Sequence, residues 1–119
     1  MALSKEEMHY LGMEFIGEEL QQMGYEFLGV NSAPKKHPQF VIFKSGEKIK
    51  FVIVRTKCVT NPKPEKPEYV ERVIDHATKQ ESGVWYAYVL LAHGDDTSQA
   101  PIKGERYSII FQGFEELLP

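Results

Sequence analysis

The sequence predicts a mixed α/β fold in a single domain, residues 1–119, and two patterns carry this prediction. Apolar residues recur at helical spacing near the start of the chain and again just before residue 80. Around these stretches lie short runs rich in valine, isoleucine, phenylalanine and tyrosine, which favour strands. The predicted order is therefore helix, three strands, helix, strand, strand. A chain of 119 residues is long enough to bury a core of its own.

The first predicted helix begins after Ser4, because Ser4 and Glu7 have the spacing of a capping box. Gly24 suits the left-handed residue that commonly follows a helix. Gly12 and Gly17 lie inside the helix, where glycine is unfavourable, so we expect the helix backbone to approach a sheet closely there. The apolar face consists of Met8, Leu11, Phe15, Ile16, Leu20 and Met23.

Three strands are expected at 25–30, 39–43 and 48–57, and they form an antiparallel meander. Ser45 and Gly46 supply turn chemistry between the second and third of these strands. The proline-rich segment 61–67 cannot continue a ladder and is predicted to be an extended connector.

The second helix is predicted to begin at Pro67 and to end near Gly83. Its apolar stripe consists of Val70, Val73, Ile74 and Ala77. Segment 85–92 is almost continuously apolar, as expected for a strand that is covered on both faces. We expect a last strand at 107–111 and a short tail at 114–118.

Composition limits the classes of function. The formal net charge is -3, so the chain as a whole is not a polycation that seeks nucleic acid. The single cysteine, Cys58, excludes an internal disulfide and a four-cysteine metal site. Acidic residues near the start do not fit a signal peptide, and no apolar run has the length of a membrane span. These features predict a cytoplasmic protein with no membrane association.

Framework residues on the first helix and the meander carry a resemblance to a known family. They are Gly12, Leu20, Gly24, Tyr25, Asn31 and the segment 51–57, Phe-Val-Ile-Val-Arg-Thr-Lys. The family pattern at that segment is apolar-Val-Glu-Val-Lys-Thr-Arg. With the order of its elements, the chain resembles the restriction-endonuclease-like PD-(D/E)XK superfamily, in particular its small bacterial members related to archaeal Holliday-junction resolvases. The resemblance implies the fold of a metal-dependent nuclease.

The chain departs from this family at the catalytic positions. Gln39 stands at the place of an aspartate, Ile53 at the place of the glutamate and Arg55 at the place of the lysine. Magnesium binds hard oxygen ligands, which these side chains do not provide as carboxylates do. We therefore expect no catalytic residues, no metal and no cofactor. An alternative is a carboxylate that has migrated to Glu14 or Glu18, although a solvated helix face explains both.

The segment 35–57 is rich in lysine and contains a single acid, Glu47. One hypothesis is a phosphate-binding stripe made of Lys35, Lys36, Lys44 and Lys57, together with Arg55. The other is that these lysines cover the exposed face of a meander, spread over different surfaces and pair with acids. We favour the second hypothesis.

Other polar residues give weaker indications. His37 is a possible ligand or acid–base group with no metal-ligand spacing around it. The loop 93–96, His-Gly-Asp-Asp, follows a predicted core strand but also forms a good turn. Cys58 is interpreted as a structural thiol. The aromatic residues Trp85, Tyr86, Tyr88 and Tyr107 are expected to pack on the sheet.

These observations predict a non-catalytic binding domain that contacts a protein partner or a second copy of itself. The alternatives are a nucleic-acid-binding module that uses the basic segment and a nuclease with a migrated carboxylate. We also expect Ile53 to be buried, with Arg55 and Gln39 on the same face of the sheet.

Overall fold

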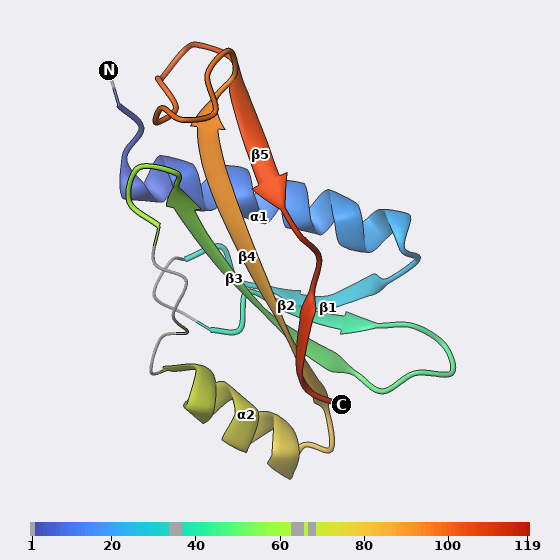
Figure 1. Ribbon diagram of the computed structural model, residues 1–119. Coiled ribbons are helices and arrows are strands. Elements are labelled where there is room, and N and C mark those ends of the chain that lie inside the picture. The colour runs from blue at the N-terminus through green and yellow to red at the C-terminus, as the bar shows by residue number, and fades with distance from the viewer. Residues whose placement is uncertain (1, 34–36, 63–65, 67–68) are drawn as a thin grey trace.

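The computed structural model describes residues 2–33, 37–62, 66 and 69–119, and within them six strands form one mixed sheet with two helices (Figure 1). The elements are α1 (Lys5–Gln22), β1 (Glu26–Val30), β2 (Phe40–Phe43), β3 (Lys50–Cys58), α2 (Tyr69–Lys79), β4 (Gly83–His93), β5 (Tyr107–Phe111) and β6 (Glu115–Leu118). The predicted mixed α/β class is confirmed, and so is the predicted order of the elements from α1 to β5.

The strands lie in the order β1-β2-β3-β4-β5. The β1–β2–β3 meander is antiparallel, whereas β3 and β4 are parallel and are connected through α2. The far edge of β4 has two partners: β5 pairs with its second half and β6 with its first. Figure 1 shows β1 and β2 running across the direction of β4, as expected when strand twist accumulates through a sheet.

Both ends of α1 are formed as the sequence predicts. Ser4 Oγ accepts from the Glu7 backbone N–H at 3.1 Å, and a Glu7 carboxylate oxygen accepts from the Ser4 N–H at 2.9 Å. These bonds satisfy two of the donors that a helix leaves open at its start. Gly24 has φ of 90° immediately after the helix, a conformation that favours glycine.

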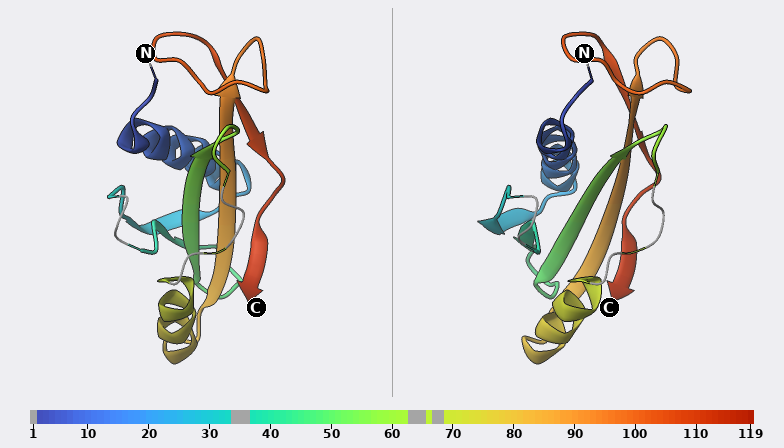
Figure 2. Two further views of the ribbon diagram at one scale, coloured as in Figure 1. Left: turned by 60° about the vertical axis from the view of Figure 1, so that its left-hand side comes forward. Right: turned by 90° about the vertical axis from the view of Figure 1, so that its left-hand side faces the viewer.

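The two helices cover opposite faces of the sheet, because alternate residues of β3 belong to different cores. Val52 and Val54 pack with α1, whereas Phe51 and Ile53 pack with α2. Ile53 is 0% exposed, so its predicted burial is confirmed. Figure 2 shows that α1 and α2 also lie at different heights along the sheet.

Two predictions near the end of the chain were wrong. Gly83 does not end a helix but begins β4, because α2 already ends at Lys79 and Glu81 makes the turn with φ of 54°. The segment 114–118, expected to be a tail, contains β6, which pairs with β4 through Leu118 opposite Val84. Pro67 lies outside the described residues.

Gly12 explains why glycine is present within α1. A Cβ at Gly12 would overlap the Thr56 side chain on β3, so only glycine allows this approach of helix to strand. A Cβ at Gly17 would lie 3.5 Å from the Phe40 ring, which is an ordinary van der Waals distance.

The two glycines therefore predict opposite effects of alanine. Gly12→Ala forces α1 away from β3 and is expected to lower the free energy of unfolding by roughly 1–3 kcal/mol. Gly17→Ala is the matched control, and it should raise this free energy by up to about 1 kcal/mol through helix propensity. Urea unfolding followed by circular dichroism measures both. A Gly12→Ala variant as stable as the parent would contradict the close packing of α1 on β3.

Candidate functional site

A buried glutamine lies where β2 and β3 separate. The two strands pair only as far as Val52, and we call the region beyond this pair the β2–β3 fork. Gln39, 0% exposed, lies in the fork: its side-chain oxygen accepts from the Val54 N–H at 2.8 Å, and its amide nitrogen donates to His37 Nδ1 at 2.5 Å. Its backbone N–H donates to the Val52 carbonyl, and its carbonyl accepts from the Asn31 N–H. The Gln39 side chain thus takes the place of a backbone carbonyl and extends the hydrogen bonding between β2 and β3 by one step.

An aromatic and cationic layer lies beside this glutamine. The rings of His37 and Tyr69 are stacked with centroids 3.5 Å apart and planes at 5°. Arg55 donates a hydrogen bond to the Tyr69 hydroxyl, and its positive charge acts on His37. The layer therefore connects the segment before β2, the start of α2 and the middle of β3.

The three residues that the resemblance places at nuclease catalytic positions, Gln39, Ile53 and Arg55, lie near the β2–β3 fork but offer no metal ligand set. Alternation along β3 places Arg55 and Ile53 on the α2 face, and Gln39 contacts His37, which stacks on α2. Ile53 is sealed beneath α2, and the Gln39 oxygen is occupied by a backbone N–H. Among the described residues, no three histidine, cysteine, aspartate or glutamate side chains come together as a metal site would need. Glu14 and Glu18 lie on the exposed side of α1.

His9 belongs to the site, although the sequence alone shows it only as one of several histidines on separate elements. It is 7% exposed and its Nε2 has no hydrogen-bond partner among the described residues. The ring also bonds to the Ser32 backbone, so this bond uses Nδ1. Burial lowers the pKa of His9, and His37 lowers it further. Its position one turn before Gly12 and Met13, on the buried side of α1, is the signal that identifies it.

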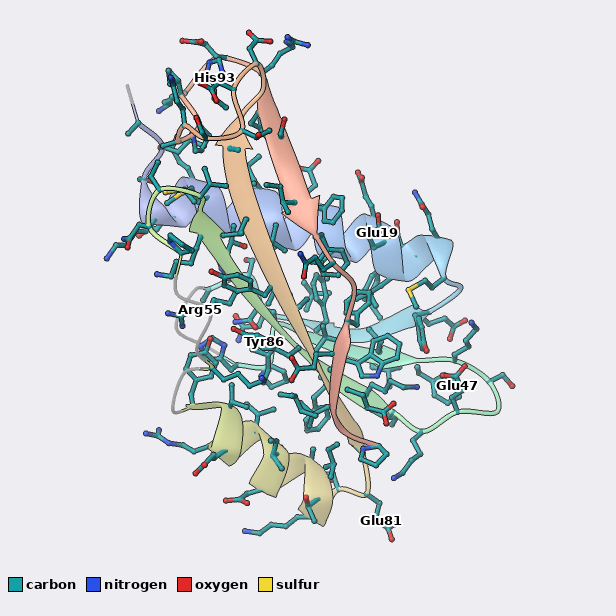
Figure 3. All side chains as sticks on the ribbon, viewed as in Figure 1. Glu19, Glu47, Arg55, Glu81, Tyr86 and His93 are labelled. Atoms are coloured by element: carbon teal, nitrogen blue, oxygen red, sulfur yellow. The ribbon has the colours of Figure 1, made fainter. Side chains whose placement is uncertain are left out.

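A hollow of about 210 Å³ opens between the start of α1 and the second half of β3. We call it the basic hollow, because its described lining contains three cations and no acid. The residues that matter for its chemistry are Lys5, His9, Arg55, Thr56, Lys57 and Tyr69. Figure 3 shows Arg55 beside β3, at a height between α1 and α2. Arg55 Nε is buried without a hydrogen-bond partner among the described residues.

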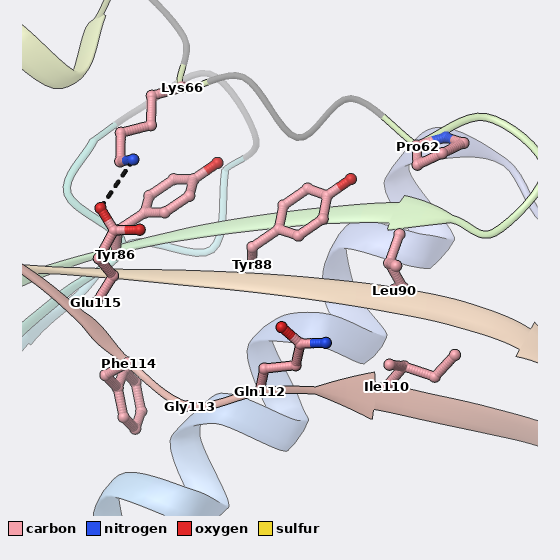
Figure 4. A pocket seen from close by; sticks show the side chains of 10 residues that line it. All are labelled: Pro62, Lys66, Tyr86, Tyr88, Leu90, Ile110, Gln112, Gly113, Phe114 and Glu115. Carbon is pink, nitrogen blue, oxygen red and sulfur yellow. Dashed lines mark ion pairs between the residues drawn. The ribbon is translucent and has the colours of Figure 1, made fainter.

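A second groove, of about 560 Å³, lies where β5 gives way to β6 (Figure 4). Tyr86, Tyr88 and Leu90 form its floor, and Lys66 and Glu115 make an ion pair of 2.8 Å at one end. Burial raises the pKa of Tyr86 far above its ordinary value, and its hydroxyl has no hydrogen-bond partner among the described residues. This groove is mainly aromatic and apolar.

The described lysines of the basic segment lie at two separate places. Lys44 donates to the Met23 carbonyl at 2.6 Å, and Lys50 pairs with Glu47 at 2.6 Å near the start of β3. Lys57 lies near the other end of β3, in the basic hollow. Lys35 and Lys36 lie outside the described residues.

The other residues considered in the sequence analysis make contacts that are typical of structural roles. His93 pairs with Glu105 at 2.9 Å, and Asp95 pairs with Arg106. The Cys58 thiol is a free thiol that contacts Thr60 Oγ1 at 3.1 Å. Three of the four aromatic residues pack as expected, because Trp85 contacts Tyr25 and Phe114 and Tyr86 stacks with Tyr88. Tyr107 does not follow the expectation, since it is 43% exposed.

Comparison with known proteins identifies the family. Residues 6–117 match the model of a family described as a domain of unknown function (DUF8840), and the chain belongs to this family. Neither the curated proteins nor the solved structures contain a significant match to the chain. Within the part of the chain that the structure describes, no helix has both the length and the apolar character needed to cross a membrane.

The buried His9 and the partly buried His37 predict a loss of stability in mild acid. Burial lowers the pKa of both His9 and His37, so the unfolded chain binds more protons than the folded chain below the ordinary histidine pKa of about 6.5. The free energy of unfolding should therefore be fully retained above this pKa and decrease as pH falls through it. Urea unfolding at a series of pH values measures the slope.

His37→Phe keeps an aromatic ring against Tyr69 but cannot take up a proton, so it should flatten this slope. The effect is read as a change in slope relative to the parent protein, because the variant also changes stability at every pH. An unchanged slope in both His9→Phe and His37→Phe would contradict the assignment of these histidines as neutral in the folded state.

Proposed function

We propose that this member of the DUF8840 family is a non-catalytic binding domain built on a restriction-endonuclease-like arrangement. The order of elements and the parallel β3–β4 pair connected through α2 support this arrangement. Gln39, Ile53 and Arg55 lie together on one face, at positions where a nuclease of this type has its acids and lysine. Such an arrangement does not imply nuclease activity, because one fold can carry unrelated functions.

The observation that carries the proposal is the role of each of these three side chains. Gln39 holds the β2–β3 fork closed, Ile53 fills the core under α2, and Arg55 brings a positive charge to the fork. A divalent cation needs several oxygen ligands and is repelled by a neighbouring guanidinium. Placing metal-binding carboxylates at these three positions would therefore remove contacts that stabilise the fold.

An exposed apolar surface at the β1 edge of the sheet supports a role in binding a protein. β1 is an edge strand, and its Leu28 and Val30 are 56% and 60% exposed. Tyr10 on α1 is 48% exposed and lines the same shallow groove as Val30. Exposed apolar side chains beside an open strand edge are features of protein interaction sites.

The two alternative functions receive less support. A nucleic-acid-binding stripe would need a continuous positive surface, whereas Lys44 and Lys57 lie at opposite ends of β3. A migrated nuclease site would need Glu14 or Glu18 to meet other acids. Both line the groove beside β1 together with Phe27 and Val30, not the β2–β3 fork.

A nuclease assay tests the non-catalytic part of the proposal. We expect no nicking of supercoiled plasmid with magnesium or manganese above the level seen in the presence of EDTA, because the fork lacks an oxygen ligand set. Calorimetry should detect no specific magnesium binding. Metal-dependent nicking that Glu14→Ala or Glu18→Ala abolishes, while Glu6→Ala does not, would overturn the proposal in favour of a migrated site.

A further inference from the structure

We infer that the basic hollow binds a phosphate group that retains a proton, such as that of a small phosphomonoester. The inference rests on the proposed function and deepens it, because it names the chemical class that one binding site takes. Three sets of atoms around the hollow would bind such a group: fixed positive charges, backbone donors and one buried acceptor.

The three positive charges come from two elements that are distant in the sequence. Lys5 lies at the start of α1, and Arg55 and Lys57 lie on β3. Arg55 is held by Tyr69, yet its Nε is buried and has no partner among the described residues. A buried guanidinium N–H without a partner is costly, and an anion in the hollow would satisfy it with a charge-assisted hydrogen bond.

The edge of β3 adds backbone donors. Along a strand, alternate N–H groups point towards the same edge. The Val54 N–H points towards β2 and is satisfied by Gln39, whereas the Val59 N–H points the other way, to the Leu91 carbonyl on β4. The N–H groups of Thr56 and Cys58 therefore point towards the β2 side. The described part of β2 ends its pairing at Val52, so this edge faces the hollow.

His9 determines which anion fits. Burial lowers its pKa, so the ring is neutral near pH 7, and the bond from Nδ1 to Ser32 leaves Nε2 as an acceptor. The other ionisable groups around the hollow are Lys5, Arg55, Lys57, Cys58 and Tyr69, with His37 nearby. An acceptor requires a donor from the ligand. A phosphate group has a second pKa of about 6 and can provide a P–OH, whereas sulfate cannot.

The size of the hollow limits the ligand. A volume of about 210 Å³ is smaller than the pockets of roughly 300–1,000 Å³ that hold drug-sized molecules. It has room for a phosphate group and little else, so the rest of the ligand would extend into solvent. A single terminal phosphate fits this shape better than the continuous backbone of a duplex.

Titration of the full chain with inorganic phosphate and with sulfate at pH 6.5, followed by nuclear magnetic resonance, tests the inference. We expect shift changes at the amides of Thr56 and Cys58 and at the ring of His9. Phosphate should bind about fivefold or more tightly than sulfate, as one additional hydrogen bond implies. Shift changes spread over the surface lysines, or equal affinity for the two anions, would overturn the inference.

Variants identify the residues responsible. Arg55→Gln should weaken phosphate binding at least about tenfold, since it removes a charge-assisted donor. Arg72→Gln, at an exposed position on α2, is the matched control and should change the affinity less than about twofold. Lys57→Gln provides a second test if Arg55→Gln does not fold. His9→Gln should remove the preference for phosphate over sulfate. Equal effects of Arg55→Gln and Arg72→Gln would refute the site.

Two further ligands distinguish the source of the phosphate. Ribose 5-phosphate should bind as tightly as inorganic phosphate or more tightly, as a small phosphomonoester should. A 5′-phosphorylated oligonucleotide that binds far more tightly than its 5′-hydroxyl counterpart and than ribose 5-phosphate would replace the small molecule with a nucleic-acid end. Absence of phosphate binding together with absence of nicking would refute this inference alone and leave the non-catalytic proposal standing.

Discussion

The hydrogen bond from the Val54 N–H to the Gln39 side chain joins two strands after their backbones have stopped pairing. A backbone N–H buried without a partner costs about 1–3 kcal/mol, so the fork needs either a third strand or a substitute acceptor. Gln39 is that substitute, and the nitrogen of the same side-chain amide orients His37 against Tyr69. The arrangement of the β2–β3 fork, and with it the position of Arg55 beside the basic hollow, depends on this neutral amide.

For the proposed nuclease-like arrangement, this dependence gives a physical reason why a fold of this kind can be kept without nuclease chemistry. An aspartate at position 39 would bring a charge that has to be neutralised by a metal or a cation, whereas glutamine satisfies both of its neighbours without any charge. Ile53 then contributes to the core under α2 instead of binding an ion. The guanidinium of Arg55 remains positive without a metal and can attract an anion to the same region.

Much of the fold was predictable from the sequence because the signals are local. The capping box at Ser4, the cap at Gly24 and the alternation around Ile53 each act within a few residues. β6 could not be predicted, because the four residues Glu-Glu-Leu-Leu have weak strand propensity and gain their structure from pairing with β4. The basic hollow could not be predicted either, because it joins Lys5 and His9 to residues about 50 positions later. A local sequence pattern does not indicate contacts between residues so far apart in the chain.

Hydrogen exchange at the fork measures whether the Gln39 side chain protects the Val54 amide as a neighbouring strand would. If Gln39 replaces a strand, the Val54 amide should exchange at a rate close to that of its neighbour Ile53, whereas the Thr56 amide, which faces the hollow, should exchange at least about tenfold faster. In Gln39→Leu the Val54 rate should rise relative to that of Ile53, a ratio that corrects for any change in global stability. A Val54 amide that exchanges as fast as Thr56 in the parent protein, or that keeps its protection in Gln39→Leu, would contradict the account.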